Sequence, residues 1–227
     1  MNAFPLLLTI YAGFAHAFEA DHLLAVSNIV SRRDNIRLSL KDGIFWGLGH
    51  TSTILLIGIL VLLFRINIST QYFQYLEAIV GFMLVILGIY RLKKLFPQKK
   101  IVIHTHLHEH EDSRHHNHLH VHIGNESKHS HPHSLAYSVG LIHGLAGSGA
   151  LIVMVMIQIK EPMSGLFYLL IFGLGSVIGM LAAAGLFSIS FSKRIMRAQS
   201  LQATLIIISA LLCVGYGGLV IYKNLLM

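Results

Sequence analysis

Two imidazoles and two carboxylates lie within seven residues of one apolar stretch: His16, Glu19, Asp21 and His22. Ionisable side chains at membrane depth are costly, by roughly 2.5–3.5 kcal/mol for each central charge, and they persist only where they have partners. No Lys or Arg lies within this stretch to neutralise the two acids. The residue types therefore predict that a bound cation neutralises them.

Two further histidines, His50 and His143, lie in later apolar stretches and join the candidate ligands. Imidazole suits nickel, cobalt, copper and zinc, whereas a magnesium or calcium site would consist of oxygen ligands. The absence of a Cys or Met cluster near His16 argues against copper(I). Divalent metals of the first transition row remain, and affinity alone does not distinguish among them. The alternative for each residue is a structural polar group bonded within the bundle, and it weighs most for Glu19.

The spacing of the first cluster restricts its geometry. At 100° per residue, Glu19, Asp21 and His22 lie at about 60°, 140° and 240° from His16 around a helix. No single helix face carries all four residues. Either the helix is locally distorted, as in transporters with discontinuous helices, or some of the four only orient the others.

Six apolar stretches must position these residues. The chain has 227 residues, of which 54% are hydrophobic and 12% charged, against about a quarter charged in a soluble domain. The stretches cover about 4–30, 42–64, 72–92, 135–158, 163–191 and 201–222, long enough to cross a bilayer as helices. We expect an all-α fold: a polytopic membrane helix bundle with six transmembrane helices.

The first stretch has no basic segment before it, which indicates a retained helix rather than a signal peptide. The single cysteine, Cys213, excludes a disulfide framework and a cysteine-based zinc site.

The basic residues predict an orientation. Fourteen of the 17 Lys and Arg residues lie in the first, third and fifth connections between the stretches. By the positive-inside rule, both termini face outside and the long connection is cytoplasmic. We expect a multi-pass protein of a bacterial inner membrane. The net charge of +7 then results from the basic residues that set the orientation in the lipid bilayer. No nucleic-acid partner is expected.

The two halves of the chain resemble each other. Tyr11 to His16 matches Tyr137 to His143, with the histidines 127 residues apart, and Gly47-Leu-Gly matches Gly173-Leu-Gly at an offset of 126. Two matches at nearly one offset predict two inverted three-helix repeats, residues 1–92 and 135–227, of the kind found in transporters. The alternative is chance similarity of glycine-rich helices. The run 144–150 predicts either close helix packing or a broken segment.

The connection between the repeats, residues 93–134, is rich in histidine. Its composition predicts a disordered, metal-binding cytoplasmic loop that buffers, delivers or senses metal. The alternative is a tolerated low-complexity insertion. Twelve of the 16 histidines lie here: His104, His106, His108, His110, His115, His116, His118, His120, His122, His129, His131 and His133.

Three motifs carry a family resemblance over nearly the whole chain. The stretch from His16 to His22 has the form H-x-x-x-x-D-H, and it resembles the signature of the nickel/cobalt transporter family. Together with Gly47-Leu-Gly-His50-Thr and His143-Gly-Leu-Ala-Gly-Ser-Gly-Ala, it looks closest to the six-helix, urease-accessory-like branch. The resemblance implies nickel or cobalt transport, with His16, Asp21 and His22 carrying the signature and His50 the Gly-His motif. Glu19 departs from the Asp more often found in the family, which leaves the metal preference open.

These observations predict a secondary transporter of Ni²⁺ or Co²⁺, with the metal as cargo and no permanently bound cofactor. The chain has no ATP-binding motif. The direction of transport stays open, because related six-helix members with histidine-rich loops act in efflux. The alternative function is a non-transporting accessory protein that binds nickel for an enzyme such as urease. We do not expect an enzyme, because the H-x-x-x-H boxes of a di-iron membrane enzyme are absent from the apolar stretches. A metallochaperone or a second copy of the chain is the expected protein partner.

Overall fold

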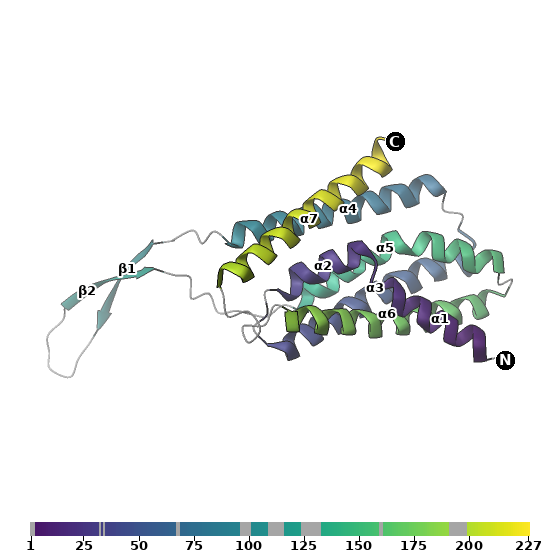
Figure 1. The fold of residues 1–227 in the computed structure, drawn as a ribbon, viewed down its shortest axis with the longest axis horizontal. Coiled ribbons are helices and arrows are strands. Elements are labelled where there is room, and N and C mark those ends of the chain that lie inside the picture. Colours follow the sequence, from purple (N-terminus) through teal and green to yellow (C-terminus); the bar gives the residue numbers. More distant parts are fainter. Residues whose placement is uncertain are drawn as a thin grey trace. The chain divides into compact units, whose positions relative to one another are not determined.

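Seven helices and one pair of strands make up the described part of the chain (Figure 1). The structure, a computed structural model, describes residues 3–31, 33, 35–66, 69–95, 101–108, 116–123, 133–158, 161–190 and 199–227. The helices are α1 Ala3–His16, α2 Ala20–Val30, α3 Ile36–Leu62, α4 Thr70–Leu95, α5 His133–Gln158, α6 Pro162–Ser190 and α7 Gln199–Leu225; the strands are β1 Ile101–His108 and β2 His116–Ile123. The chain divides into a helical unit, Met1–Leu92 with Pro132–Met227, and a strand unit, Lys93–His131.

Four described helices are long and apolar enough to cross a membrane, namely Ile36–Leu62, Gln71–Leu95, Pro162–Ile189 and Ala203–Leu225. They make this a multi-pass membrane protein. Helix α5 has 26 residues and continues through the glycine-rich run 144–150. The run is therefore not a broken segment, and at Gly144 glycine permits close packing, since a Cβ there would lie 2.5 Å from the carbonyl oxygen of His50. The full count of six spans stays a prediction.

The first apolar stretch, expected as one helix over 4–30, is two helices. The last turn of α1 tightens, with the amides of Phe18 and Glu19 donating to the carbonyls of Ala15 and His16 at 2.9 and 3.0 Å. Glu19 is extended, with φ −66° and ψ 156°, and α2 begins after it. Alone, the 14 residues of α1 span only about 21 Å of a hydrocarbon core that is about 30 Å thick. The break contains neither Gly nor Pro, so tertiary packing stabilises it.

Helix α3 lies between α5 and α6 at distances that only glycine allows. A Cβ added at Gly49 would lie 2.3 Å from the carbonyl oxygen of Tyr137 in α5. One added at Gly47 would lie 2.8 Å from the Cα of Val177 in α6. The small-residue faces thus bring three helix backbones together, as is common in membrane bundles.

Close contacts recur at the offset that relates the two halves of the sequence. A Cβ at Gly140 would meet the carbonyl oxygen of Trp46 at 2.1 Å, and one at Gly13 would meet that of Phe172 at 2.0 Å. The two glycines are 127 residues apart and the two aromatic residues 126. Helix α3 thus packs on α5 through the same positions by which α6 packs on α1.

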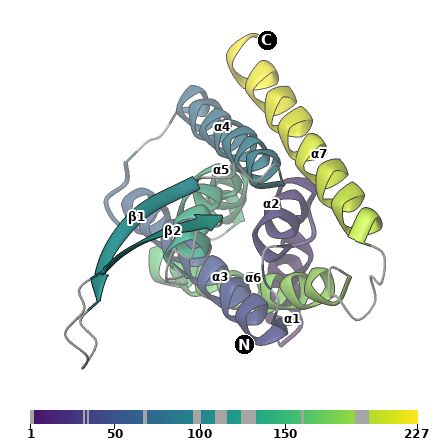
Figure 2. The same cartoon turned by 90° about the vertical axis from the view of Figure 1, so that its left-hand side faces the viewer.

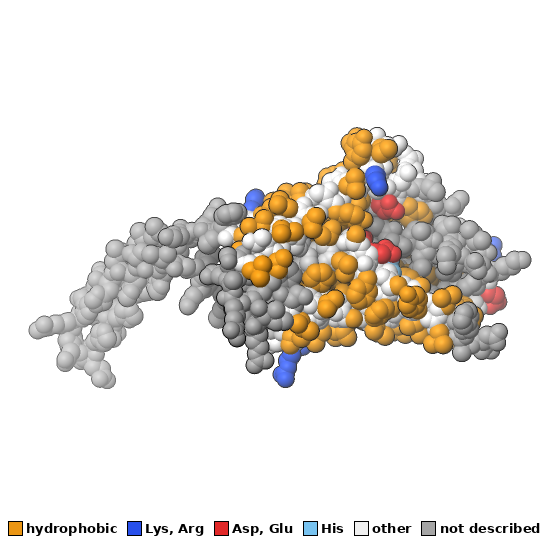
Figure 3. Space-filling model, viewed as in Figure 1, with side chains coloured by type: hydrophobic (Ala, Val, Ile, Leu, Met, Phe, Trp, Pro, Cys, Tyr) orange, Lys and Arg blue, Asp and Glu red, His pale blue; other side chains and the backbone are white. Residues whose placement is uncertain are grey.

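Helices α4 and α7 form a pair at one side of the other helices, as Figures 1 and 2 show. Gly81 and Gly217 face each other, since a Cβ added to either would lie within 2.8 Å of the other's carbonyl oxygen. The Cys213 thiol donates to the carbonyl of Leu84 at 3.3 Å and is buried, so it serves packing. Hydrophobic side chains cover much of the described surface seen in Figure 3, as expected for helices that face lipid.

The strand unit corrects one expectation. The connection over 93–134 was expected to be disordered, but β1 and β2 pair as an antiparallel two-stranded sheet. The fold is thus all-α only within the helical unit. Both strands alternate histidine with Val, Ile, Leu or Thr over several residues, and such alternation favours a strand. His110, His115, His129 and His131 lie outside the described residues.

Candidate metal centre

Three histidines lie around a fourth, His22, and each of the four comes from a different helix. The ring centroid of His22 lies 4.5 Å from that of His16, 4.6 Å from that of His143 and 5.2 Å from that of His50. His16 ends α1, His22 lies in the first turn of α2, and His50 and His143 come from α3 and α5. We call these four residues the four-histidine centre. Residues up to 127 positions apart in sequence thus lie in one cluster around His22, as the polar residues of the apolar stretches predict.

Two overlapping groups of ligand atoms lie in this centre. His16, His22 and His50 form one group, and Asp21, His22 and His143 form the other. Within each group, one ligand atom from every residue lies within 4.8 Å of those of the others. His22 belongs to both groups, so it is the residue on which either site depends.

The ring nitrogens of the centre lack the partners that buried polar atoms normally have. Six nitrogens have no hydrogen-bond partner among the described residues: Nε2 of His16, Nε2 of His22, and both nitrogens of His50 and of His143. Each such buried group costs about 1–3 kcal/mol when it is left unsatisfied. A neutral imidazole offers one lone pair. A cation coordinated by one nitrogen of a ring would remove that part of the deficit, and the donor set of imidazoles and one carboxylate fits a divalent transition metal.

The two carboxylates orient the rings. Asp21 Oδ1 lies 3.0 Å from Nδ1 of His22, and its Oδ2 lies 3.6 Å from Nε2 of His143. Glu19 Oε1 lies 2.9 Å from Nδ1 of His16. Metal-binding histidines commonly donate their second N–H to a carboxylate in this way, which fixes the ring and leaves the other nitrogen for the metal.

The break between α1 and α2 makes this arrangement possible. It turns the chain between His16 and Asp21, so that residues spread around a regular helix face the same region. It also places Asp21 in the first turn of α2, where the helix dipole favours a negative charge. The structure brings the six predicted ligands into one cluster, but Glu19 lies at its edge: its side chain is 59% exposed, contacts His16 and belongs to neither group of ligand atoms. Metal binding by these residues stays a prediction.

Known proteins match this chain over most of its length. The model of the family described as the cytochrome c biogenesis protein transmembrane region matches residues 12–219. The chain belongs to this family. The urease accessory protein UreH of Bacillus sp. (strain TB-90) is 38% identical over 192 residues, which are 82% of this chain and 77% of that protein. The chloroplast protein FOR GROWTH AND FERTILITY 1 of Arabidopsis thaliana is 26% identical over 218 residues, 92% of this chain and 57% of that protein. No solved structure matches.

These relatives bear on two sequence-based expectations. The urease-accessory part of the family resemblance is confirmed, whereas the nickel/cobalt transporter part stays a prediction. The family is named for a transmembrane region and the UreH relative for an accessory role, which agrees with the expectation that this family member is not an enzyme.

Sequence reasoning missed Trp46, which lies beside the centre in this family member, and Ser176, a buried polar residue of α6. The Trp46 ring centroid lies 5.6 Å from that of His22 and 5.8 Å from that of His143, so the indole forms one wall. Ser176 is fully buried in α6, and its hydroxyl has no partner among the described residues. Ser176 stands 126 positions after His50. The internal repeat was thus the signal that could have identified it.

A second polar cluster lies at the start of α3 and α5. The buried carboxylate of Asp42 accepts hydrogen bonds from Nε and Nη2 of Arg33, the second at 2.8 Å. It also lies 2.9 Å from Nδ1 of His133, whose ring stacks on Phe45 at 5.1 Å. His133 was expected among the loop ligands, but the structure places it in α5 with a carboxylate partner. The aspartate at the start of an apolar stretch, nine residues after an arginine, was the missed signal.

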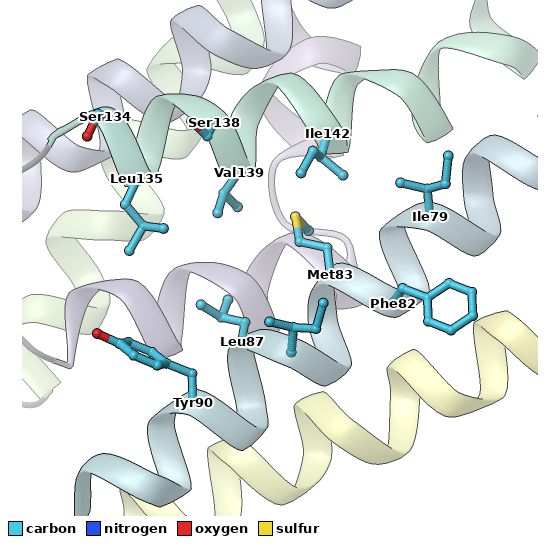
Figure 4. A pocket seen from close by; sticks show the side chains of 11 residues that line it. Ile79, Phe82, Met83, Leu87, Tyr90, Ser134, Leu135, Ser138, Val139 and Ile142 are labelled. Atoms are coloured by element: carbon cyan, nitrogen blue, oxygen red, sulfur yellow. The ribbon is translucent and has the colours of Figure 1, made fainter.

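The helical unit also holds a groove of about 790 Å³ between α4 and α5. Figure 4 shows Met83 and Leu87 of α4 facing Leu135, Val139 and Ile142 of α5. Its lining residues include no His, Asp, Glu or Cys. The four-histidine centre, where imidazole and carboxylate ligand atoms gather, is therefore the candidate functional site of the helical unit.

Proposed function

We propose that this protein is a membrane accessory protein that binds Ni²⁺ at the four-histidine centre and supplies it for the maturation of a nickel enzyme such as urease. The observation that carries this proposal is the convergence of His16, His50 and His143 on His22. The likeness to a urease accessory protein supports the choice of nickel and of an accessory role.

The ligand set suits an ion that has left water inside a membrane. Neutral imidazoles bind the metal without adding charge, while Asp21 supplies one negative charge beside His22. A divalent cation and a carboxylate partly neutralise each other, which lowers the cost of burying either. The same chemistry accommodates Co²⁺, so cobalt is the alternative metal.

A second candidate function is secondary transport of Ni²⁺ or Co²⁺. The contacts that recur at offsets of 126 and 127 support two inverted three-helix repeats. In this arrangement α1 with α2 forms the first of six spans, and the metal site lies where the repeats meet. Relative motion of the repeats would then expose the centre to each side in turn.

We further propose the membrane, the orientation and the partners of this protein. The distribution of Lys and Arg supports a bacterial inner membrane protein with both termini outside and the histidine-rich segment in the cytoplasm. A cytoplasmic metallochaperone would then receive the metal at the cytoplasmic face of the membrane. A second copy of the chain is the other candidate partner.

The test measures binding and flux with one set of proteins. A full-length variant with the eleven histidines from His104 to His131 replaced by serine isolates the four-histidine centre and keeps His133, which contacts Asp42. In nanodiscs it should bind about one Ni²⁺, and His22→Ala in the same background should abolish this binding. The control is Thr9→Ala, which changes a half-buried residue of α1 whose hydroxyl donates to the carbonyl of Pro5 in the same helix. The proposal fails if the isolated centre binds no metal.

Flux then separates the two functions. The same proteins are reconstituted in liposomes that contain a dye quenched by Ni²⁺. Binding without dye quenching supports the accessory role alone. Quenching that depends on His22 shows that the protein also transports the ion.

A further inference from the structure

The two strands of the strand unit pair so that histidine stands opposite histidine. The antiparallel register joins His104 with His120, His106 with His118, and His108 with His116. The seventh histidine of the two strands, His122, stands opposite Val102. We call β1 and β2 the histidine ribbon and each pair of opposite histidines a rung.

All seven histidines occupy one face of this ribbon. Successive residues of a strand alternate between its two faces. The register pairs even-numbered positions with even-numbered positions, and every histidine in both strands has an even number. The odd-numbered positions hold no histidine and are mostly aliphatic: Ile101, Ile103, Thr105, Leu107, Asn117, Leu119, Val121 and Ile123. A shift by one residue would place every histidine opposite an odd-numbered residue, so the arrangement depends on the register.

The spacing of the rungs suits metal ions. Directly opposite residues in an antiparallel pair have Cβ atoms about 4.5–5.5 Å apart, and successive rungs follow at about 6.7 Å. A metal–imidazole bond is about 2.0–2.1 Å long. Two opposite imidazoles can therefore share one ion, while histidines of neighbouring rungs are further apart.

We propose that the histidine ribbon is an ordered metal-binding array in which each rung binds one divalent transition-metal ion. Its capacity is set by the three rungs of the register and not by the number of histidines. Ni²⁺, Co²⁺, Zn²⁺ and Cu²⁺ share the preference for imidazole that the rungs require. The proposal rests on the proposed function for the class of metal, but it assigns a separate site.

Metal binding and strand pairing stabilise each other in this array. An isolated two-stranded hairpin is marginally stable in water. An ion bound across a rung joins the two strands, so the free energy of binding also stabilises the ribbon. The ribbon should therefore gain protection of its backbone amides against hydrogen exchange when the metal is added.

The test compares two double variants of the full-length protein that remove the same number of histidines. His104→Ala with His120→Ala removes one rung, while His104→Ala with His118→Ala breaks two. Each is equilibrated with Ni²⁺, and the bound metal is counted per chain by elemental analysis. The first variant should lose one ion relative to the wild type and the second two. Any ion at the four-histidine centre is common to all three proteins.

The outcomes are separate from those for the four-histidine centre. Equal losses in the two variants, whatever their size, would show that the register plays no part and would overturn the array. The array is equally overturned if neither variant loses metal. A centre that binds no nickel would refute the proposed function but leave the difference between the two variants unchanged.

Discussion

The four-histidine centre and the histidine ribbon use one residue type in two ways. In the centre, each histidine comes from a different helix, and packing over separations of up to 127 residues brings the rings together. In the ribbon, the histidines lie at every second position of two neighbouring strands. A site that depends on tertiary packing fails when one helix moves. A site that depends on local register loses its parts one at a time.

The largest effect should follow from removing the residue that both ligand groups share. We expect His22→Ala to weaken nickel binding at the centre roughly 100-fold or more, above the range for losing a residue that only orients a ligand. A ribbon histidine such as His106 should affect at most one of three rungs. Isothermal titration of the two variants compares the losses. Similar losses in both would contradict the difference between the two regions.

The next effect concerns a histidine that was counted with the loop but lies in the helical unit. His133 is a histidine of the loop composition, yet it contacts Asp42 in the helical unit at 2.9 Å. We expect Asp42→Asn to lower the free energy of unfolding by about 3 kcal/mol, because it removes the buried negative charge that Arg33 contacts. Metal stoichiometry should not change. Thermal unfolding in detergent measures the first quantity, with the exposed Glu161→Gln as control.

A smaller effect should come from the packing that positions the centre. Gly140 lets α5 approach α3, and a Cβ there would lie 2.1 Å from the carbonyl oxygen of Trp46. We expect Gly140→Ala to destabilise the protein by about 1–3 kcal/mol and to weaken binding at the centre while sparing the ribbon.

The matched control for this prediction is Gly215→Ala in α7. An added Cβ at Gly215 has nothing within 4 Å, so the helix should gain up to about 1 kcal/mol from the better propensity of alanine. If both substitutions lower the midpoint of thermal unfolding equally, close approach at Gly140 is not what positions His143.

The sequence predicted the residues of the centre better than the backbone that holds them. Polar residues in apolar stretches stand out because membrane burial makes them costly, and this identified His16, His22, His50 and His143. The break after His16 was left as one of two possibilities. It has neither Gly nor Pro as a local signal and results from packing of distant helices. A break was considered at the glycines from Gly144 onward, where the structure has a continuous helix.

The ribbon shows the opposite case. Composition predicted metal ligands and disorder, because a histidine-rich tract cannot build a core. The alternation of histidine with aliphatic residues was the overlooked signal, since period two is the pattern of a strand. The pairing register lay beyond prediction, because composition and alternation do not say which residues of the two strands stand opposite each other. Asp42 was missed although Arg33, nine residues before it, was the available signal, and Ser176 was missed although it stands 126 positions after His50.

The smallest effect tests which carboxylate belongs to the centre. Glu19 contacts Nδ1 of His16 at 2.9 Å but is 59% exposed, whereas the Asp21 side chain is 21% exposed and lies next to His22. Solvent screens Glu19, and water can replace its hydrogen bond to the ring. We expect Glu19→Gln to weaken nickel binding less than about tenfold and Asp21→Asn to weaken it about 10–100-fold. Both substitutions preserve size, so titration of the pair compares charge alone. If Glu19→Gln had the larger effect, the metal would lie on the His16 side of the centre, and the group containing Asp21, His22 and His143 would not be the principal site.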